Sequence, residues 1–486
     1  MNHEYPDWAL AFRKPGTELR FINNTYYLYE VTAFYDPVKK KGRKKTGPLL
    51  GKITQSDGFI PSAKKSLKDK ASAGVDISKI SVRECGFSNF LTVYGNEIEN
   101  NLKKFFPHHY RLIIYMAYCR LVHNSPINRM SLLISKSMLS ADDPQSIYPK
   151  KLSDVLAQIG TDRVQCTAYM KSFITPGEHM LVDMTNMFSG SEKMYYAKEG
   201  YNSDMVFDTQ INLMYIYSSQ TNQPLFYRLL NGNTREVSGF KNCLIESGIR
   251  DAIIVADKGF YSKANIELLD QHGLKYIIPL KRNDAMIDYS RFDETQNDYF
   301  KYEGRIIWMT QYEQNGTIIN MFKDDKLGTQ ERKDYLQRID SYLDGYTREK
   351  FNAKLPQFGT FAIVTNLIDE PMQDIYTKYK SRNAIEVMFD GIKSVLKADV
   401  SFMQKEESLN GWMFINHIAL QWYYKIYALL AENKMLHKYS VKHFITELKE
   451  HRKVLINNEW IEEIMLKDTK KILTKLNLYS VNSIKS

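Results

Sequence analysis

The chain has 486 residues, of which 43% are hydrophobic and 25% are charged, which is ordinary for a soluble globular protein and argues against a low-complexity chain. The length allows about two to four domains with at least one large core. Lysine and arginine total 66 against 56 for aspartate and glutamate, so the net charge of +10 favours a polyanionic partner, such as a nucleic acid or a membrane surface.

The cysteines and the amino-terminal residues indicate a cytosolic protein. Cys85, Cys119, Cys166 and Cys243 are far apart and form no C-x-x-C pair. They are expected to be reduced thiols, not a disulfide framework or a zinc site. No basic region followed by an apolar run stands at the start, so no signal peptide is expected. Residues 411–430 approach the length of a membrane span, but their Asn, His, Gln and Lys side chains favour a buried helix.

The predicted elements begin with strands and a basic hairpin. Residues 20–55 alternate between apolar and polar side chains, as half-buried strands do. A run of cations lies between two of these strands, at the expected tip of a hairpin, and consists of Lys39, Lys40, Lys41, Arg43, Lys44 and Lys45. Two interpretations remain open, a solvated loop and a tip that contacts the phosphates of a nucleic acid.

Residues 90–175 are mostly helical in pattern, and residues 101–123 form the clearest amphipathic segment. A helix-turn-helix would fit in this block, but no turn signature assigns a recognition helix. From residue 179 the pattern changes to short apolar strands and helices. The expected strands are residues 180–185, 209–217, 224–230, 252–256 and 276–280. This order predicts a mixed α/β sheet whose carboxyl ends present a site.

Residues 283–360 interrupt the alternation of strands and helices. They combine strand-like pieces at 304–312 and 317–322 with a charged helical stretch around 330–344. We therefore expect an insertion. Residues 361–366 return to strand, a helix follows, and a basic helical tail ends the chain.

Two acids stand at the ends of expected strands. Asp183 ends the first strand, and Asp257 directly follows the strand at 252–256. An acid in this position is held on rigid backbone at a sheet edge, where active sites form in α/β folds. Gly259 allows a sharp turn there. Two or three such carboxylates can bind a pair of Mg²⁺ ions, about 3.5–4 Å apart, that act on a phosphodiester. The alternatives for each motif alone are that Asp183 only ends a strand and that residues 257–259 form a common turn.

A third acid lies in residues 379–393. If this segment is one helix, a narrow stripe contains Tyr379, Arg382, Glu386 and Lys393, at about 100° per residue. A carboxylate set among a phenol, a guanidinium and an ammonium suits a site that holds a metal beside a phosphate. The alternative is a surface helix with a weak ion pair between Arg382 and Glu386.

Together these motifs resemble the DDE transposases of bacterial insertion sequences, in the branch whose third acid lies in a Tyr-x₂-Arg-x₃-Glu-x₆-Lys signature. Residues 379–393 match this signature at every position. The second-acid motif matches residues 257–260, and the first-acid strand matches residues 182–185. Residues 232–236 also resemble their counterpart in the family. The resemblance covers about 180–430 closely and the amino-terminal block loosely.

The resemblance implies an RNase H-like catalytic core and cut-and-paste transposition. In this reaction the protein binds the terminal inverted repeats of its insertion sequence, cleaves the DNA ends and joins the 3′-OH ends to target DNA. By position, Asp183, Asp257 and Glu386 would ligate two Mg²⁺ or Mn²⁺ ions. The implied partners are double-stranded DNA and a second copy of the chain, in a homodimer on DNA. The implied location is the cytoplasm, in association with the nucleoid.

The resemblance also implies residues that contact DNA. Tyr379, Arg382 and Lys393 would hold phosphate near the cleavage point. In relatives the insertion supplies an aromatic side chain that stacks on a flipped base of a hairpin intermediate. Trp308 is the candidate here, and the alternative is that it belongs to the core.

The predicted fold is therefore α/β, with an RNase H-like mixed-sheet core that a mainly β insertion interrupts. The expected regions are a β region with the basic hairpin at 1–60, a mostly helical DNA-binding region at 61–175, the first part of the core at 176–282, the insertion at 283–360, the second part of the core at 361–432 and a helical tail at 433–486.

Two other functions remain open. A metal-dependent nuclease with the same core would cleave DNA without strand transfer. A DNA-binding protein descended from a transposase would lack catalysis and is expected to have lost acids. The presence of all three acids counts against this last alternative.

Overall fold

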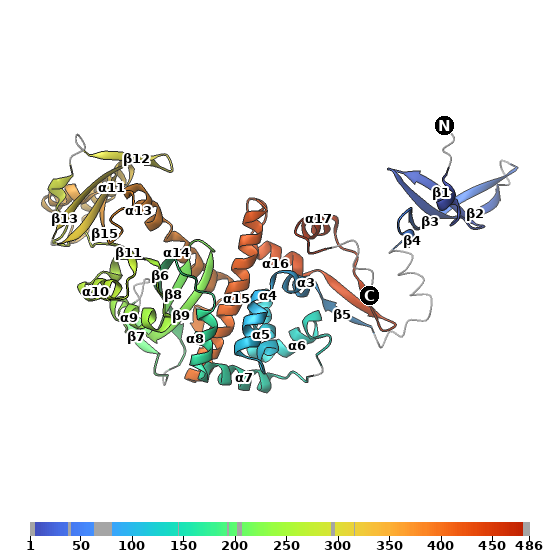
Figure 1. Cartoon of the computed structure of the whole chain (residues 1–486), viewed down its shortest axis with the longest axis horizontal. Helices are drawn as coiled ribbons and strands as arrows, with labels where there is room; N and C mark the ends of the chain where they lie inside the picture. Colours follow the sequence, from blue (N-terminus) through green and yellow to red (C-terminus); the bar gives the residue numbers. More distant parts are fainter. Residues whose placement is uncertain are drawn as a thin grey trace. The chain divides into compact units, whose positions relative to one another are not determined.

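The computed structural model describes residues 5–36, 40–62, 80–143, 145–191, 194–201, 207–292, 297–314 and 316–479 (Figure 1). The chain divides into two compact units. The first comprises Met1–Arg83 with Arg452–Met465, and the second comprises Glu84–His451 with Leu466–Ser486.

The first unit contains an antiparallel sheet in which neighbours in sequence are neighbours in space. Its strands are β1 (Thr17–Ile22), β2 (Thr25–Asp36), β3 (Lys41–Thr54) and β4 (Gly58–Pro61), preceded by the short helix α1 (Asp7–Leu10). Asn23 and Asn24 connect β1 to β2 with positive φ angles of 47° and 62°, as tight hairpin turns require. Leu19, Leu28 and Ile53 form the centre of a small core.

A second sheet contains β5 (Ser81–Glu84), β17 (Arg452–Ile456) and β18 (Glu459–Glu462), in the order β18-β17-β5. Asn457 and Asn458 have φ angles of 50° and 64° and form the hairpin turn between β17 and β18. The sequence predicted a helical tail after residue 433, but this tail is not wholly helical. It contains this hairpin between α16 (Val441–Lys449) and α17 (Lys467–Lys475).

The second unit begins with helices. They are α3 (Gly86–Tyr94), α4 (Asn96–Phe105), α5 (Tyr110–His123), α6 (Ile127–Ser135), α7 (Pro149–Thr161) and α8 (Arg163–Lys171). The prediction of one amphipathic helix at 101–123 is wrong. The helical structure is interrupted between α4 and α5, where Pro107 lacks an N–H to donate. Nor is α5 amphipathic, since residues 112–121 are all buried.

Within the described residues, eleven strands form one mixed sheet in the order β12-β13-β14-β15-β11-β10-β6-β8-β7, with β9 on β8 and β16 on β6. The strands are β6 (His179–Ser189), β7 (Lys198–Tyr201), β8 (Phe207–Ser218), β9 (Gln223–Asn231), β10 (Ile253–Ala256), β11 (Lys275–Pro279), β12 (Asp298–Tyr302), β13 (Arg305–Gln314), β14 (Thr317–Asp324), β15 (Thr360–Thr365) and β16 (Val400–Ser401). Because β10 is parallel to both β6 and β11, these three strands share a carboxyl edge. The predicted α/β fold with a mixed-sheet core is confirmed.

Helices α9 (Glu236–Ser247) and α10 (Lys263–Gln271) connect the core strands. Ser262 caps α10 by accepting a hydrogen bond from the N–H of Asn265, as the sequence predicted. Residues 283–360, which the sequence predicts as an insertion, contain α11 (Asp325–Asp340) and α12 (Arg348–Lys354) besides strands β12–β14. These strands do not form a separate sheet, because β14 pairs with β15 and β15 pairs with β11.

Strand β15 is followed by α13 (Met372–Lys380) and α14 (Asn383–Asp390), a π turn at Gly391–Val395, strand β16 and then α15 (Glu406–Glu432). Helix α15 is the long orange helix of Figure 1. Most of its side chains from Leu409 to Leu430 are buried, so the expectation of a buried helix is confirmed. Among the described helices, none is both long and apolar enough to cross a membrane.

Candidate active site

Strand pairing brings the first two acids together. Ala256 of β10 pairs with Val182 of β6, so Asp257 and Asp183 each follow a paired residue on neighbouring parallel strands. Neighbouring strands lie about 4.8 Å apart, which places the two backbones side by side. The structure corrects one detail, since Asp183 does not end its strand. Strand β6 continues to Ser189, and Asp183 pairs across it with Tyr215 of β8.

Arg382 connects the third acid to the first. Its Nη1 donates to Oδ2 of Asp183 at 3.0 Å, and its Nη2 donates to Oε1 of Glu386, one helical turn away. The side chains of Asp183 and Arg382 are 13% and 18% exposed, whereas that of Glu386 is 49% exposed. In the candidate site, the Asp183 carboxylate is therefore mostly buried, whereas the Glu386 carboxylate is accessible to solvent.

The sequence predicted one continuous helix around the third acid, but the structure divides this segment into two helices, α13 and α14. Helix α13 ends at Lys380, and the N–H groups of Arg382, Ala384 and Ile385 each bond to the carbonyl three residues earlier. Bonds of this type tighten the turn relative to an α-helix. The single straight stripe expected for residues 379–393 is therefore wrong. The contact between Arg382 and Glu386 forms nonetheless, because Arg382 is the N-cap residue of α14 and Glu386 lies in the first turn of this helix.

Burial and neighbouring charges both change the pKa values at the site. Burial raises the pKa of Asp183 to about 7, and the charges of Asp257 and Glu236 act in the same direction. Arg382 and the N–H of Met184, which donates to Asp183 at 2.8 Å, only partly offset this increase in pKa. Burial lowers the pKa of Arg382, but the attraction of the surrounding carboxylates outweighs it and raises that pKa above its usual value. Burial, more than the charges of the neighbouring acids, therefore disfavours the charged form of Asp183.

Glu236 is a fourth acid at this site, to which the sequence analysis assigned no role. A Cβ atom placed on Gly259 would lie 1.6 Å from its Oε2, so the carboxylate packs directly on the turn that follows Asp257. Burial raises the pKa of Glu236, and the charge of Asp257 raises it further. The sequence feature that could have indicated this role is the acid at the end of the segment 232–236, which resembles its counterpart in the family.

Buried amides hold the segment that leads to Glu236. Nε2 of Gln210 donates to the carbonyl of Gly232 at 2.9 Å, and Nδ2 of Asn212 donates to the carbonyl of Thr234 at the same distance. A side chain at Gly232 would lie 2.1 Å from the carbonyl oxygen of Gln210, so only glycine fits. Strand β8 therefore fixes where α9 begins, and with it the position of Glu236.

The other residues of the predicted helix stripe differ in their surroundings. The ring of Tyr379 packs on that of Phe361, with centroids 5.6 Å apart, and burial raises the pKa of its phenol, which also contacts Arg382. Lys393 lies in the π turn and is half-buried. Among the described residues, Lys393 makes no ion pair or hydrogen bond with the three acids.

Trp308 lies on β13 of the insertion. Its Nε1 donates to Asp325 at 2.9 Å, and its ring lies beside the exposed ring of Tyr299, with centroids 5.4 Å apart. Its neighbour Ile307, on the opposite face, is completely buried. Trp308 therefore sits on the half-exposed face of the insertion rather than within its core.

The basic run belongs to the first unit, whereas the acids belong to the second. Lys39 lies outside the described residues, and Lys40 is in the turn with a φ of 46°. Lys41, Arg43, Lys44 and Lys45 are on β3 itself and are exposed. Most of the run is thus strand, not loop.

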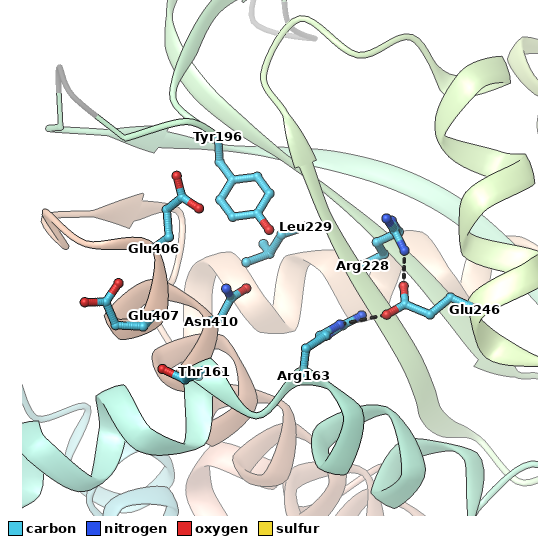
Figure 2. Close-up of a pocket in the computed structure, with 10 residues that line it drawn as sticks. Thr161, Arg163, Tyr196, Arg228, Leu229, Glu246, Glu406, Glu407 and Asn410 are labelled. Carbon is cyan, nitrogen blue, oxygen red and sulfur yellow. Dashed lines mark hydrogen bonds and ion pairs between the residues drawn. The ribbon is translucent and has the colours of Figure 1, made fainter.

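A cleft of about 380 Å³ lies elsewhere in the second unit, and none of the four acids lines it (Figure 2). Glu246 there accepts from both Arg163 and Arg228, and these ion pairs, against the effect of burial, lower its pKa. The two arginines are thus occupied in joining α8, β9 and α9.

Residues 175–422 match the family model described as the transposase DDE domain. This match covers more than half of the chain, and the chain therefore belongs to the DDE transposase domain family. Among solved structures, the chain is similar to that in the cryo-EM structure of a piggyBac transposase synaptic complex with hairpin DNA, with 13% identity and a TM-score of 0.40. The similarity covers 70% of this chain and 69% of the other. No curated protein sequence matches the chain.

Proposed function

We propose that the protein is the transposase of a bacterial insertion sequence, which binds the terminal inverted repeats, cleaves the DNA ends and joins their 3′-OH groups to target DNA. The main support is the contact of Arg382 with both Asp183 and Glu386, beside Asp257, in a chain of the DDE transposase domain family. Residues separated by 199 positions in sequence meet there, which a surface ion pair would not require.

The donor set fits Mg²⁺ or Mn²⁺. Asp183, Asp257 and Glu386 offer carboxylate oxygens, which these hard cations prefer. Burial, and to a smaller extent the neighbouring acids, raise the pKa of Asp183 to about 7, and a bound cation would favour the charged form of this carboxylate. When bound, two such ions activate an attacking oxygen and stabilise the leaving oxygen of a phosphodiester.

The chain's own residues would position the DNA. Arg382 offers a planar guanidinium that binds a phosphate through two hydrogen bonds, and burial against the acids fixes its orientation. Tyr379 and Lys393 would bind phosphate beside it. Trp308, half-exposed next to Tyr299, offers a π-face to an unstacked base. We further propose a homodimer on the DNA, in the cytoplasm and associated with the nucleoid.

A strand-transfer assay tests this proposal. Purified protein is incubated with Mg²⁺, a duplex that carries the DNA end flanking the gene and a supercoiled target plasmid. Joined products support a transposase. Cleavage without joining would instead indicate a nuclease with the same core, and DNA binding without either reaction would indicate a non-catalytic descendant.

A further inference from the structure

The outer halves of β2 and β3 form a two-stranded ribbon that extends beyond the first sheet. On one side, β1 pairs with β2 only as far as Glu30. On the other side, β4 pairs with β3 only from Gly51 onwards. Among the described residues, 32–35 and 42–45 therefore have only each other as strand partners. At about 3.4 Å per residue, the extension from 41 to 46 is about 20 Å long.

The ribbon is exposed on both faces. Every described residue from 32 to 35 and from 40 to 46 is exposed. Phe34 and Tyr35 are 47% and 65% exposed, although folded proteins usually bury such large side chains. Residues 31–46 contain six cations and a single acid, Asp36.

Strand register sorts these side chains between the faces. Directly opposed residues of an antiparallel pair point to the same side. Phe34 pairs with Arg43 and Thr32 pairs with Lys45, so these residues share one face, to which Lys41 also belongs by alternation. We call this the cationic face. The opposite face carries Lys44, which pairs with Ala33, and Tyr35, which pairs with Gly42.

We infer that this ribbon inserts into the major groove of double-stranded DNA with the cationic face towards the base edges. The major groove of B-form DNA is about 12 Å wide and admits a two-stranded ribbon. The cations then lie between two rows of phosphates, and Phe34 offers an apolar contact to thymine methyl groups. This inference rests on the proposed function for its partner, but it is tested without catalysis.

The first experiment measures binding in the absence of metal. Full-length protein is titrated into a short labelled B-form duplex at several salt concentrations. Replacement of Lys41, Arg43 and Lys45 with Gln should weaken binding and reduce the salt slope by up to about three. The control replaces Lys442, Lys467 and Lys471 with Gln, which removes the same charge from exposed helical positions outside the ribbon. Equal effects in the two variants would overturn the inference and leave a solvated hairpin whose lysines only keep its edges from pairing.

The second experiment resolves the faces. Arg43→Gln should weaken binding more than Lys44→Gln, and Phe34→Ala more than Tyr35→Ala, because each pair contrasts adjacent residues on opposite faces. Equal losses within both pairs would contradict the assigned face. All four positions are exposed, so folding is expected to be retained, and circular dichroism checks it.

The third experiment identifies the groove. Dimethyl sulfate methylates guanine N7 in the major groove, and bound protein should protect this atom, with protection lost in the Lys41, Arg43 and Lys45 variant. An RNA duplex of the same sequence should bind more weakly, since its major groove is too deep and narrow to enter. Equal RNA binding, or unprotected guanine N7, would refute groove insertion. Strand transfer is scored separately, so loss of the proposed function and loss of this contact are distinguishable.

Discussion

The backbone of Gly259 packs directly against the carboxylate of Glu236, at a distance that leaves no room for a methyl group. Gly259 stands two residues after Asp257, and Glu236 opens a helix that the buried amides of β8 position. The contact joins the start of α9 to the turn that follows β10 and Asp257. It makes Glu236 part of the environment of the acids, although the three-acid motif does not include it.

This contact predicts a specific coupling. Glu236→Gln should keep the fold but reduce Mg²⁺-dependent cleavage by about tenfold or more, by removing one charge beside Asp257. Gly259→Ala should have a similar effect, because the new methyl group displaces the flexible end of Glu236 and not the backbone. Cleavage rates and Mn²⁺ binding are measured for both variants.

A double-mutant cycle provides the control for this coupling. Once Glu236 is Ala, Gly259→Ala should cost little more activity, since nothing remains to be displaced. Additive losses would show that the glycine matters for another reason and that Glu236 does not act through this contact.

The three acids are expected to be needed for cleavage. Asp183→Asn, Asp257→Asn and Glu386→Gln keep the shape of each side chain but remove its charge, so each should lower DNA cleavage by about a thousandfold or more. Binding of uncleaved DNA should persist. Asp390→Asn is the matched control, because Asp390 is exposed on the same helix as Glu386, one turn further on. Substantial cleavage by any one of the three variants would remove that residue from the metal site.

Arg382 is expected to be needed for its shape as well as its charge. Arg382→Ala should abolish cleavage or joining, and Arg382→Lys should restore little, since an ammonium cannot contact Asp183 and Glu386 through one planar fork. End cleavage and strand transfer are measured at matched stability. Full activity of the lysine variant would show that only a positive charge is required.

The control for Arg382 must be chosen from the structure. Lys380, off the predicted stripe, is unsuitable because its ammonium packs over the rings of Phe361 and Tyr376, and burial lowers its pKa. Lys275→Gln is better, since Lys275 is exposed at the amino end of β11, away from the carboxyl edge. It should retain activity and stability within about 0.5 kcal/mol.

Stability should depend on the protonation of Glu84, which lies outside the candidate site. Burial raises the pKa of Glu84 to about 7, while its oxygens accept from the N–H of Phe87 and from Ser137 Oγ. The folded state therefore binds more protons than the unfolded state between about pH 4.5 and 7, so stability falls as pH rises through this window. Glu84→Gln removes this dependence and should gain up to about 3 kcal/mol relative to the original chain by pH 8.

Thermal unfolding of both proteins from pH 4.5 to 8 measures this difference. Comparison of the two proteins cancels other groups that titrate in the same range, including Asp183. A constant gap between their melting temperatures across the range would contradict the raised pKa of Glu84.

The sequence predicted the strands that carry Asp183 and Asp257, because apolar runs followed by acids are a local pattern. It did not predict that Val182 pairs with Ala256, the register that puts the two acids side by side, since pairing is a tertiary property. The same limit hid the role of Glu236, whose contact with Gly259 joins segments far apart in sequence.

Local errors in the prediction have local causes. The helical periodicity of residues 101–123 predicts one helix although Pro107 interrupts it. In the same way, the helical periodicity of residues 379–393 does not reveal the tight turn at Arg382. The basic composition of the tail favours helices and concealed the hairpin of β17 and β18, although Asn457 and Asn458 tolerate the positive φ angles that its turn requires.

Strand β15 bonds to β14 on one edge and to β11 on the other. An unbroken set of backbone hydrogen bonds therefore runs from β13, which bears Trp308, to β10, which leads into Asp257. A lid on a flexible hinge would lack such a connection. If Trp308 stacks on an extruded base, as proposed above, the base and Asp257 would be held by strands of one hydrogen-bonded sheet.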